Sequence, residues 1–149
     1  IEAAVQVPLI SIIDLSVTAC TGFDKVGILA TDSCLQSRIY QDALAAGNIA
    51  VVQPDNDDLA ALMDLITQIK SGDRSDAITL AMQRLAETLV AEGAQAIIAG
   101  CTEIPLVLRD AMLEVPLIAS TDVLAVATVE IARGNLDEDP LRIGVRFPP

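Results

Sequence analysis

The chain lacks histidine altogether, and its only cysteines are Cys20, Cys34 and Cys101. Without histidine it can form neither an internal Cys-His nucleophile pair nor a histidine-ligated zinc site. The cysteines show no metal-ligand spacing and no CxxC motif, so we expect no metal and no dithiol redox motif. Three widely spaced cysteines indicate free thiols in a reducing cytosol rather than a disulfide framework. A thiolate that acts as a base, or as a nucleophile without histidine, stays open.

Basic and aromatic residues are also scarce. The chain carries 9 Lys and Arg against 21 Asp and Glu, a formal net charge of −12, which argues against nucleic acid as a partner. Its aromatic residues, Phe23, Tyr40 and Phe147, offer no base-stacking platform. No apolar stretch reaches bilayer-spanning length, and Ile1-Glu2 does not begin a signal peptide. We therefore expect a cytoplasmic protein without a membrane partner.

What is present is an apolar chain with a regular alternation of segments. With 149 residues, 52% of them apolar, it can bury a core and suits one domain or little more. Short apolar runs typical of parallel strands alternate with segments of helical periodicity. Strands are predicted over residues 7–13, 25–31, 49–53, 94–99 and 115–119, and helices over 14–19, 37–46, 59–70, 75–92, 104–112 and 122–133. The pattern predicts an α/β fold of the doubly wound, Rossmann/flavodoxin-like type, a parallel sheet flanked by helices.

The most informative residue is Cys101, which directly follows the predicted strand 94–99 and Gly100. Thr102, Glu103 and Pro105 are favoured in the first turn of a helix, so Cys101 is predicted to lie at a helix N-terminus. That position would lower the pKa of the thiol and favour thiolate chemistry near neutral pH. The alternative is a small buried cysteine that fills space below a turn.

The predicted sheet also places Cys101 relative to another strand. Ligands of such folds bind at the carboxyl ends of the strands. We expect Thr31, at the end of the strand 25–31, and Cys101 to lie at adjacent carboxyl ends of the sheet.

Two segments of the chain resemble each other. Residues 7–14 read VPLISIID, and residues 115–122 read VPLIASTD. If this similarity is real, the two halves of a longer protein are structurally equivalent, and a cysteine that matches Cys101 would lie upstream of Ile1. The chain then reads as the later part of something larger.

These residues carry a family resemblance. The GCTE motif of residues 100–103 with Ile104-Pro105, the GILAT segment of residues 27–31 and both VPLI segments look like the cofactor-independent aspartate/glutamate racemase family. The likeness runs from about residue 1 to residue 133. Members of this family resemble two stacked α/β lobes related by a pseudo-twofold axis, with the active site in the cleft between them.

The resemblance implies a division of the chain. Residues 21–112 would form the second α/β lobe, which carries Cys101. Residues 1–20 would be a strand and link that belong to the first lobe, and residues 113–135 a segment that returns to it. Residues 136–149 would be a tail, and the main body of the first lobe would be absent.

The resemblance also implies the chemistry, which is proton transfer at the α-carbon of an amino acid without pyridoxal phosphate, metal or other cofactor. Two thiols face opposite sides of the α-carbon, and Cys101 would be one of them. Thr102 would bind the substrate carboxylate through its hydroxyl and amide, and the helix N-terminus would add positive charge. Glu103 would either hydrogen-bond from behind the substrate-contacting residues or simply be a favourable acid in the first turn of a helix.

The chain departs from the family where an Ala-Thr-x-x-Thr pattern is common. Here the sequence is Ala-Thr-Asp-Ser-Cys, so Thr31 carries over as a substrate-binding residue but Cys34 carries over only as a position behind the site. Ser33 could supply the missing hydroxyl, whereas Asp32 is an unexpected neighbour for a dianionic substrate. Cys34 belongs to the same lobe as Cys101, which argues against a role as the opposing thiol, and Cys20 is expected to serve packing.

Three functions are compatible with the sequence. The first is a racemase of aspartate, glutamate or a relative, of which this chain is an inactive fragment without the first-lobe cysteine. The second is a decarboxylase or cis-trans isomerase of small dicarboxylates that uses one cysteine. The third is a non-catalytic ligand-binding module in which Cys101 is structural. We expect a small amino acid or dicarboxylate as ligand, and a homo-oligomer such as a dimer, or association with the missing first lobe.

Overall fold

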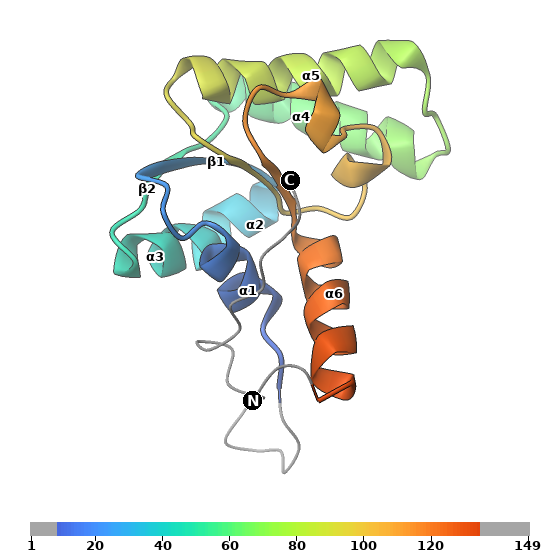
Figure 1. Cartoon of the computed structure of the whole chain (residues 1–149). Helices are drawn as coiled ribbons and strands as arrows, with labels where there is room; N and C mark the ends of the chain where they lie inside the picture. The colour runs from blue at the N-terminus through green and yellow to red at the C-terminus, as the bar shows by residue number, and fades with distance from the viewer. Residues whose placement is uncertain (1–8, 135–149) are drawn as a thin grey trace.

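The computed structural model describes residues 9–134, which form a four-stranded parallel sheet covered by helices on both faces (Figure 1). The strand order is β2-β1-β3-β4, and every neighbouring pair is parallel. The strands are β1 (Lys25–Leu29), β2 (Ala50–Val52), β3 (Ile97–Ala99) and β4 (Leu117–Ala119). The expected α/β fold class is confirmed.

Helices connect and cover these strands. They are α1 (Ile12–Ala19), α2 (Asp32–Ser37), α3 (Ile39–Ala46), α4 (Asn56–Lys70), α5 (Asp76–Ala91) and α6 (Ser120–Ala132), with short 3-10 turns η2 (Ile104–Leu106) and η3 (Asp110–Met112). In Figure 1, α4 and α5 lie on one side of the sheet, and α1, α3 and α6 lie on the other.

Each face of the sheet has its own apolar core, because successive strand residues point to opposite faces. Leu29 and Ile97 pack with α4 and α5. Ile28 and Ile98 pack with α1, α3 and α6. Glycine at position 27 leaves room for the Ile97 side chain to pack against β1, since a Cβ at position 27 would lie 2.6 Å from Ile97 Cδ1. The central strands β1 and β3 have continuous buried apolar runs because helices cover both of their faces.

The register of β1 and β3 places two of the predicted site residues together. Leu29 pairs with Ala99, and the Gly100 N–H donates to the Leu29 carbonyl at 2.8 Å. Thr31 and Cys101 each lie two residues beyond that pair. The expectation that they lie at adjacent carboxyl ends is therefore confirmed.

The strand predicted over residues 7–13 is wrong for the residues that the structure describes. Residues 9–11 are irregular, and Ile12 and Ile13 already belong to α1. Ser11 caps this helix, because its hydroxyl accepts the Asp14 N–H at 3.2 Å. A serine followed three residues later by an acid is a helix-start signal that the apolar run concealed. Residues 7 and 8, like the predicted tail 136–149, lie outside the described residues.

The helices predicted over 37–46 and 104–112 also need correction. The first region contains two helices, α2 and α3, separated by Arg38, which adopts the left-handed conformation with φ 58°. The second region contains only η2 and η3, and Arg109 between them is extended. Buried Ile104 and Leu108 have helical spacing, but the chain must turn back there to enter β4, and this tertiary constraint prevails over local periodicity.

The segments assigned above to the first lobe have contacts within this unit. β4 is hydrogen-bonded to β3, and α1 packs against both α3 and α6. How the chain divides between two lobes stays a prediction.

Candidate active site around Cys101

Cys101 is half-buried at the carboxyl end of β3, directly after Gly100. A Cβ at position 100 would lie 3.1 Å from Ala30 Cβ and 3.2 Å from Tyr40 Cε2. Only glycine fits there without displacing its neighbours. The close packing of residue 100 therefore fixes where the following thiol emerges from the sheet.

The thiol belongs to a compact hydrogen-bonded group with the two residues that follow it. Cys101 Sγ donates to Glu103 Oε2 at 2.9 Å, and Thr102 Oγ1 donates to the same oxygen at 2.9 Å. The hydrogen bond from Cys101, supported by the one from Thr102, lowers the pKa of the Glu103 carboxyl. Glu103 is thus an ionised acceptor that orients both side chains.

The pKa of Cys101 is raised, and the lowering expected from the sequence is wrong. Burial is the largest cause, and the side-chain hydrogen bond and charge of Glu103 add to it, while the Glu103 backbone hydrogen bond and Lys70 lower the pKa of Cys101. The segment directly after Cys101 forms the three-residue 3-10 turn η2 and not an α-helix. The helix dipole therefore contributes neither to the thiol nor to a bound carboxylate, and the first-turn explanation of Glu103 gives way to the hydrogen-bonded one.

Backbone donors are free at the same place. Within residues 9–134, the N–H groups of Cys101 and Thr102 have no hydrogen-bond acceptor. An anion at this end of the sheet could accept from them. Such donors, rather than a helix terminus, supply local positive potential in a chain of net charge −12.

The three predicted site residues that follow β1 have different surroundings. Thr31 caps α2, and its Oγ1 accepts the Cys34 N–H at 3.4 Å. Ser33 is exposed and donates to Asp32 Oδ1 at 3.0 Å. Cys34 is half-buried, which raises the pKa of its thiol. The structure thus groups Cys101 with Thr102 and Glu103, places Thr31 beside them, and leaves Ser33 bonded within its own helix.

Three further residues of this region were not anticipated from the sequence. The Tyr40 hydroxyl and Ser120 Oγ share a buried hydrogen bond of 2.8 Å behind Gly100, and Lys70 exerts its charge on Cys101 and Glu103. Tyr40 is the chain's only tyrosine, which is the one sequence signal that could have singled it out. Nothing in the local sequence connects Lys70 or Ser120 to Cys101.

All three cysteines are free, as expected. Cys20 is fully buried and donates to the Ser16 carbonyl at 3.1 Å, and burial raises the pKa of its thiol to about 12. Its environment is that of a packing residue. Among residues 9–134, no group of three or more Cys, Asp or Glu side chains could hold a metal ion. Over the same range, none of the helices has the length and apolar character needed to cross a membrane.

Comparison with known proteins places these features in context. Residues 1–128 match the family model described as Asp/Glu/Hydantoin racemase. The chain is 37% identical over 126 residues to a Pectobacterium carotovorum protein named "Uncharacterized protein in pnlA 3'region", covering 82% of this chain and 83% of that protein. It is 30% identical over 130 residues to the broad specificity amino-acid racemase RacX of Bacillus subtilis, covering 87% of this chain and 56% of RacX.

A solved structure shares the fold. The crystal structure of a Yersinia pestis protein provisionally named an Asp/Glu racemase superposes with a TM-score of 0.81 at 32% identity. The match covers 89% of this chain and 59% of that protein. The chain therefore spans little more than half the length of RacX and of the Yersinia pestis protein, although it spans most of the Pectobacterium relative.

Proposed function

Because the chain belongs to the Asp/Glu/Hydantoin racemase family, we propose that it supplies one of the two thiols of an amino-acid racemase that uses neither pyridoxal phosphate nor a metal. The substrate class is a small acidic amino acid, aspartate, glutamate or a relative. The observation that carries this proposal is the Cys101 thiol, hydrogen-bonded to Glu103 at the carboxyl end of β3, with Thr31 at the neighbouring carboxyl end of β1.

The chemistry follows from the protonation state of Cys101. Burial and the Glu103 carboxylate raise the pKa of this thiol, so Cys101 is the protonated partner in the substrate-free protein. A thiolate on the opposite side of the substrate removes the α-proton, and Cys101 delivers its own proton to the other face of the α-carbon. One C–H bond breaks, another forms, and no oxidant is consumed.

Glu103 has a defined part in this exchange. After Cys101 gives up its proton, the new thiolate lies beside a carboxylate, and this repulsion favours return of a proton to sulfur. Glu103 is a positioning residue, because it acts through Cys101 and Thr102 rather than on the substrate.

Substrate binding is assigned to donors at the same end of the sheet. The backbone N–H groups of Cys101 and Thr102 would bind the α-carboxylate, and the hydroxyls of Thr102 and Thr31 would complete the donor set. Ser33 stays a candidate for the side-chain carboxylate, provided that its hydroxyl exchanges Asp32 for the ligand.

The second thiol is proposed to come from outside this chain. Cys34 follows β1 on the same sheet as Cys101, so it does not offer an opposite face to the α-carbon. RacX is nearly twice as long as the matched part of this chain, which leaves room for a first lobe with its own cysteine. Residues 1–149 alone are then expected to associate with themselves or with that lobe, and not to racemise.

Inversion of L-aspartate and L-glutamate in heavy water, followed by circular dichroism, together with α-hydrogen exchange, followed by proton NMR, tests the proposal. In a gene product that contains both lobes, Cys101→Ser should abolish inversion of both amino acids and Cys34→Ser should leave most of it, because a serine hydroxyl is too weakly acidic to cycle its proton near neutral pH. Exchange without inversion can persist in Cys101→Ser, since the opposing thiolate still removes the α-proton and returns a deuteron to the same face. Inversion that persists in Cys101→Ser would contradict the mechanism. For residues 1–149 alone, a monomer by light scattering that inverts either amino acid would contradict the missing-lobe argument.

One observation favours a second candidate. Cys101 is the only cysteine of residues 9–134 that lies within two residues of the end of a strand, and one thiol suffices for a decarboxylase or a cis-trans isomerase of small dicarboxylates. Loss of a carboxylate from a substituted malonate without any exchange on amino acids would establish that alternative.

A further inference from the structure

A pocket separate from Cys101 lies at the outer edge of the sheet, between α3 and β2. Its volume is about 350 Å³, within the range of small-ligand pockets. Arg38, Gln41 and Ala45 line it from the helix side, and residues 49–51 with Gln53 line it from the strand side. Strand β1 stands between β2 and β3, so this pocket and the carboxyl end of β3 are different places.

The strand side of the pocket offers backbone groups. Among residues 9–134, β2 is an edge strand, with β1 as its neighbour in the sheet. The Ala50 N–H donates towards β1, to the Asp24 carbonyl at 2.8 Å. Successive residues of a strand direct their N–H and C=O groups to opposite sides, so those of Val51 face outward, into the pocket that Val51 lines. An extended chain laid along β2 could bond to both.

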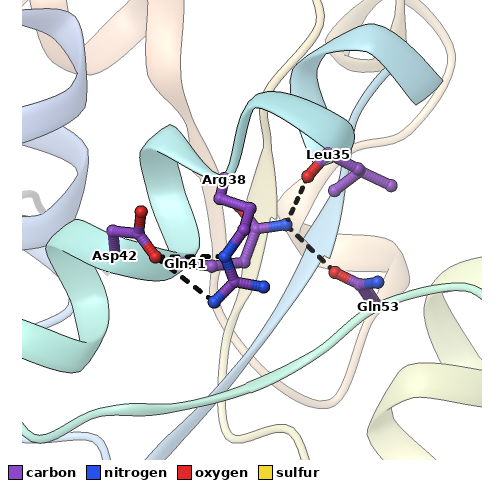
Figure 2. Close-up of polar contacts among 5 residues, drawn as sticks. All are labelled: Leu35, Arg38, Gln41, Asp42 and Gln53. Atoms are coloured by element: carbon purple, nitrogen blue, oxygen red, sulfur yellow. Dashed lines mark hydrogen bonds and ion pairs between the residues drawn. The ribbon is translucent and has the colours of Figure 1, made fainter.

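The helix side holds a buried acceptor without a donor. Gln41 is 6% exposed, and its Nε2 donates to the Leu35 carbonyl and to Gln53 Oε1, both at 3.0 Å (Figure 2). The bond to the Leu35 carbonyl fixes the amide, because turning it over would place its oxygen against that carbonyl oxygen. Gln41 Oε1 therefore stays without a partner among residues 9–134. Because this oxygen is itself shielded from solvent, Gln41 lines the pocket without offering it an open acceptor.

Arg38 gives the pocket its charge. It is the sole charged residue among those that line the pocket, in a chain of net charge −12. Its Nε and Nη2 both contact Asp42 Oδ1 at 3.2 Å, with the two side chains 65% and 67% exposed (Figure 2). Such an exposed pair contributes little to stability, so Arg38 can exchange Asp42 for a ligand carboxylate.

The position of Arg38 determines in which direction a bound peptide strand would run. α3 runs back along β2, since its end leads into β2 through Gly47 and its start lies by Gln53, as the Gln41–Gln53 hydrogen bond requires. Arg38 is therefore at the carboxyl end of β2. A ligand strand whose own carboxylate meets Arg38 must run parallel to β2, like every other strand of this sheet.

We propose that this pocket binds the free carboxyl end of a short extended peptide, which adds a parallel strand to the outer edge of β2. Val51 exchanges main-chain hydrogen bonds with the peptide, and Arg38 binds the terminal carboxylate. A three-residue strand is about 10 Å long, which matches an extended tripeptide.

Nitrogen-15 NMR of residues 1–149 tests this proposal with two probes. One is an equimolar mixture of N-acetyl tripeptides with free carboxylates, and the other is the same mixture as carboxamides. The Val51 and Gln53 backbone signals and the Gln41 side-chain amide signal should shift, with half-saturation at about tenfold lower concentration for the carboxylates. Arg38→Ala should remove this preference, whereas Arg84→Ala, exposed on α5 and outside the pocket, should keep it.

A second variant addresses the main-chain contact. Val51→Pro removes an N–H that faces away from β1, a position where an edge strand tolerates proline, so the fold should persist while both mixtures bind less tightly. Unchanged binding in Val51→Pro, equal binding of acids and carboxamides, or no shifts at all would overturn the proposal. Signal shifts confined to Thr31 and Cys101 would also overturn it. The same holds if the β2 signals shift with protein concentration in the absence of peptide, because a second copy of the chain would then be the occupant.

Discussion

Replacing Glu103 by glutamine isolates the electrostatic control of Cys101. The substitution keeps an oxygen that can accept the thiol proton but removes the negative charge 2.9 Å from sulfur. Because the hydrogen bond and charge of Glu103 help to raise the pKa of Cys101, the pKa should fall in Glu103→Gln. More of the thiol should then be ionised near neutral pH, and alkylation should be faster.

The size of the effect follows from the distance and the exposure of the pair. Glu103 is half-exposed, so its charge is largely screened, and at 2.9 Å the interaction is worth about 1–2 kcal/mol. That energy corresponds to a roughly five- to thirtyfold larger thiolate fraction. The thiolate also becomes a weaker nucleophile as its pKa falls, which cancels about half of the gain on a logarithmic scale. The net acceleration should be about two- to fivefold.

The assay is the rate of iodoacetamide modification at Cys101, read by mass spectrometry of the peptide that contains it. Cys34 serves as an internal reference, because no interaction between its side chain and Glu103 is found within residues 9–134. Glu92→Gln is the matched control, since it removes an exposed carboxylate that does not act on Cys101. Raising the salt concentration should shrink the difference between the wild-type chain and Glu103→Gln.

The reasoning is refuted if Glu103→Gln leaves Cys101 alkylation unchanged or slows it while Cys34 keeps its rate. That result would mean that burial alone sets the protonation of Cys101. Glu103 would then lose its proposed part in proton return.

Three further predictions concern stability, each measured by urea unfolding. The folded-state pKa of Cys20, about 12, lies above its ordinary value of 9.0, so the stability it contributes is complete below pH 9 and is lost as pH rises towards 12. Between about pH 8 and pH 11, the free energy of unfolding should fall by about 2–3 kcal/mol more in the wild-type chain than in Cys20→Ser. Equal falls in the two chains would contradict the raised pKa of Cys20. Gly27→Ala should cost about 1–3 kcal/mol by overpacking against Ile97, whereas Gly47→Ala, at an ordinary φ of −87°, should change stability by less than about 1 kcal/mol; similar values for both would refute the packing argument. Tyr40→Phe should cost about 1–2 kcal/mol because it leaves the buried Ser120 hydroxyl unpaired, and adding Ser120→Ala should cost less than the sum of the single changes.

Much of the fold could be predicted from the sequence because it depends on local patterns. The apolar runs of β1 and β3 and the long amphipathic α4 and α5 were correctly located, since burial on both faces demands continuous apolar strands and burial on one face demands helical periodicity. The position of Cys101 directly after a strand and a glycine was predictable for the same reason.

Local patterns failed where tertiary packing decides the conformation. The VPLISII run reads as a strand, yet Ser11 and Asp14 start a helix within it. The segment after Cys101 has helical spacing, yet it forms only short turns because the chain must return to β4. The loss of that helix removed the expected cause of a low Cys101 pKa.

The sequence by itself determined the class of fold, the family and the thiol at the end of β3, because these depend on residues close together in the chain. Only the tertiary structure decided the surroundings of that thiol. The core that buries it includes residues of α4 and α5, and Lys70, whose charge acts on it, lies some 30 residues away in the chain. The same holds for the pocket at β2, where Arg38, Gln41 and Val51 meet only because α3 folds back along an edge strand. Through-space contacts set the protonation of a thiol and the lining of a pocket, and no local pattern encodes them.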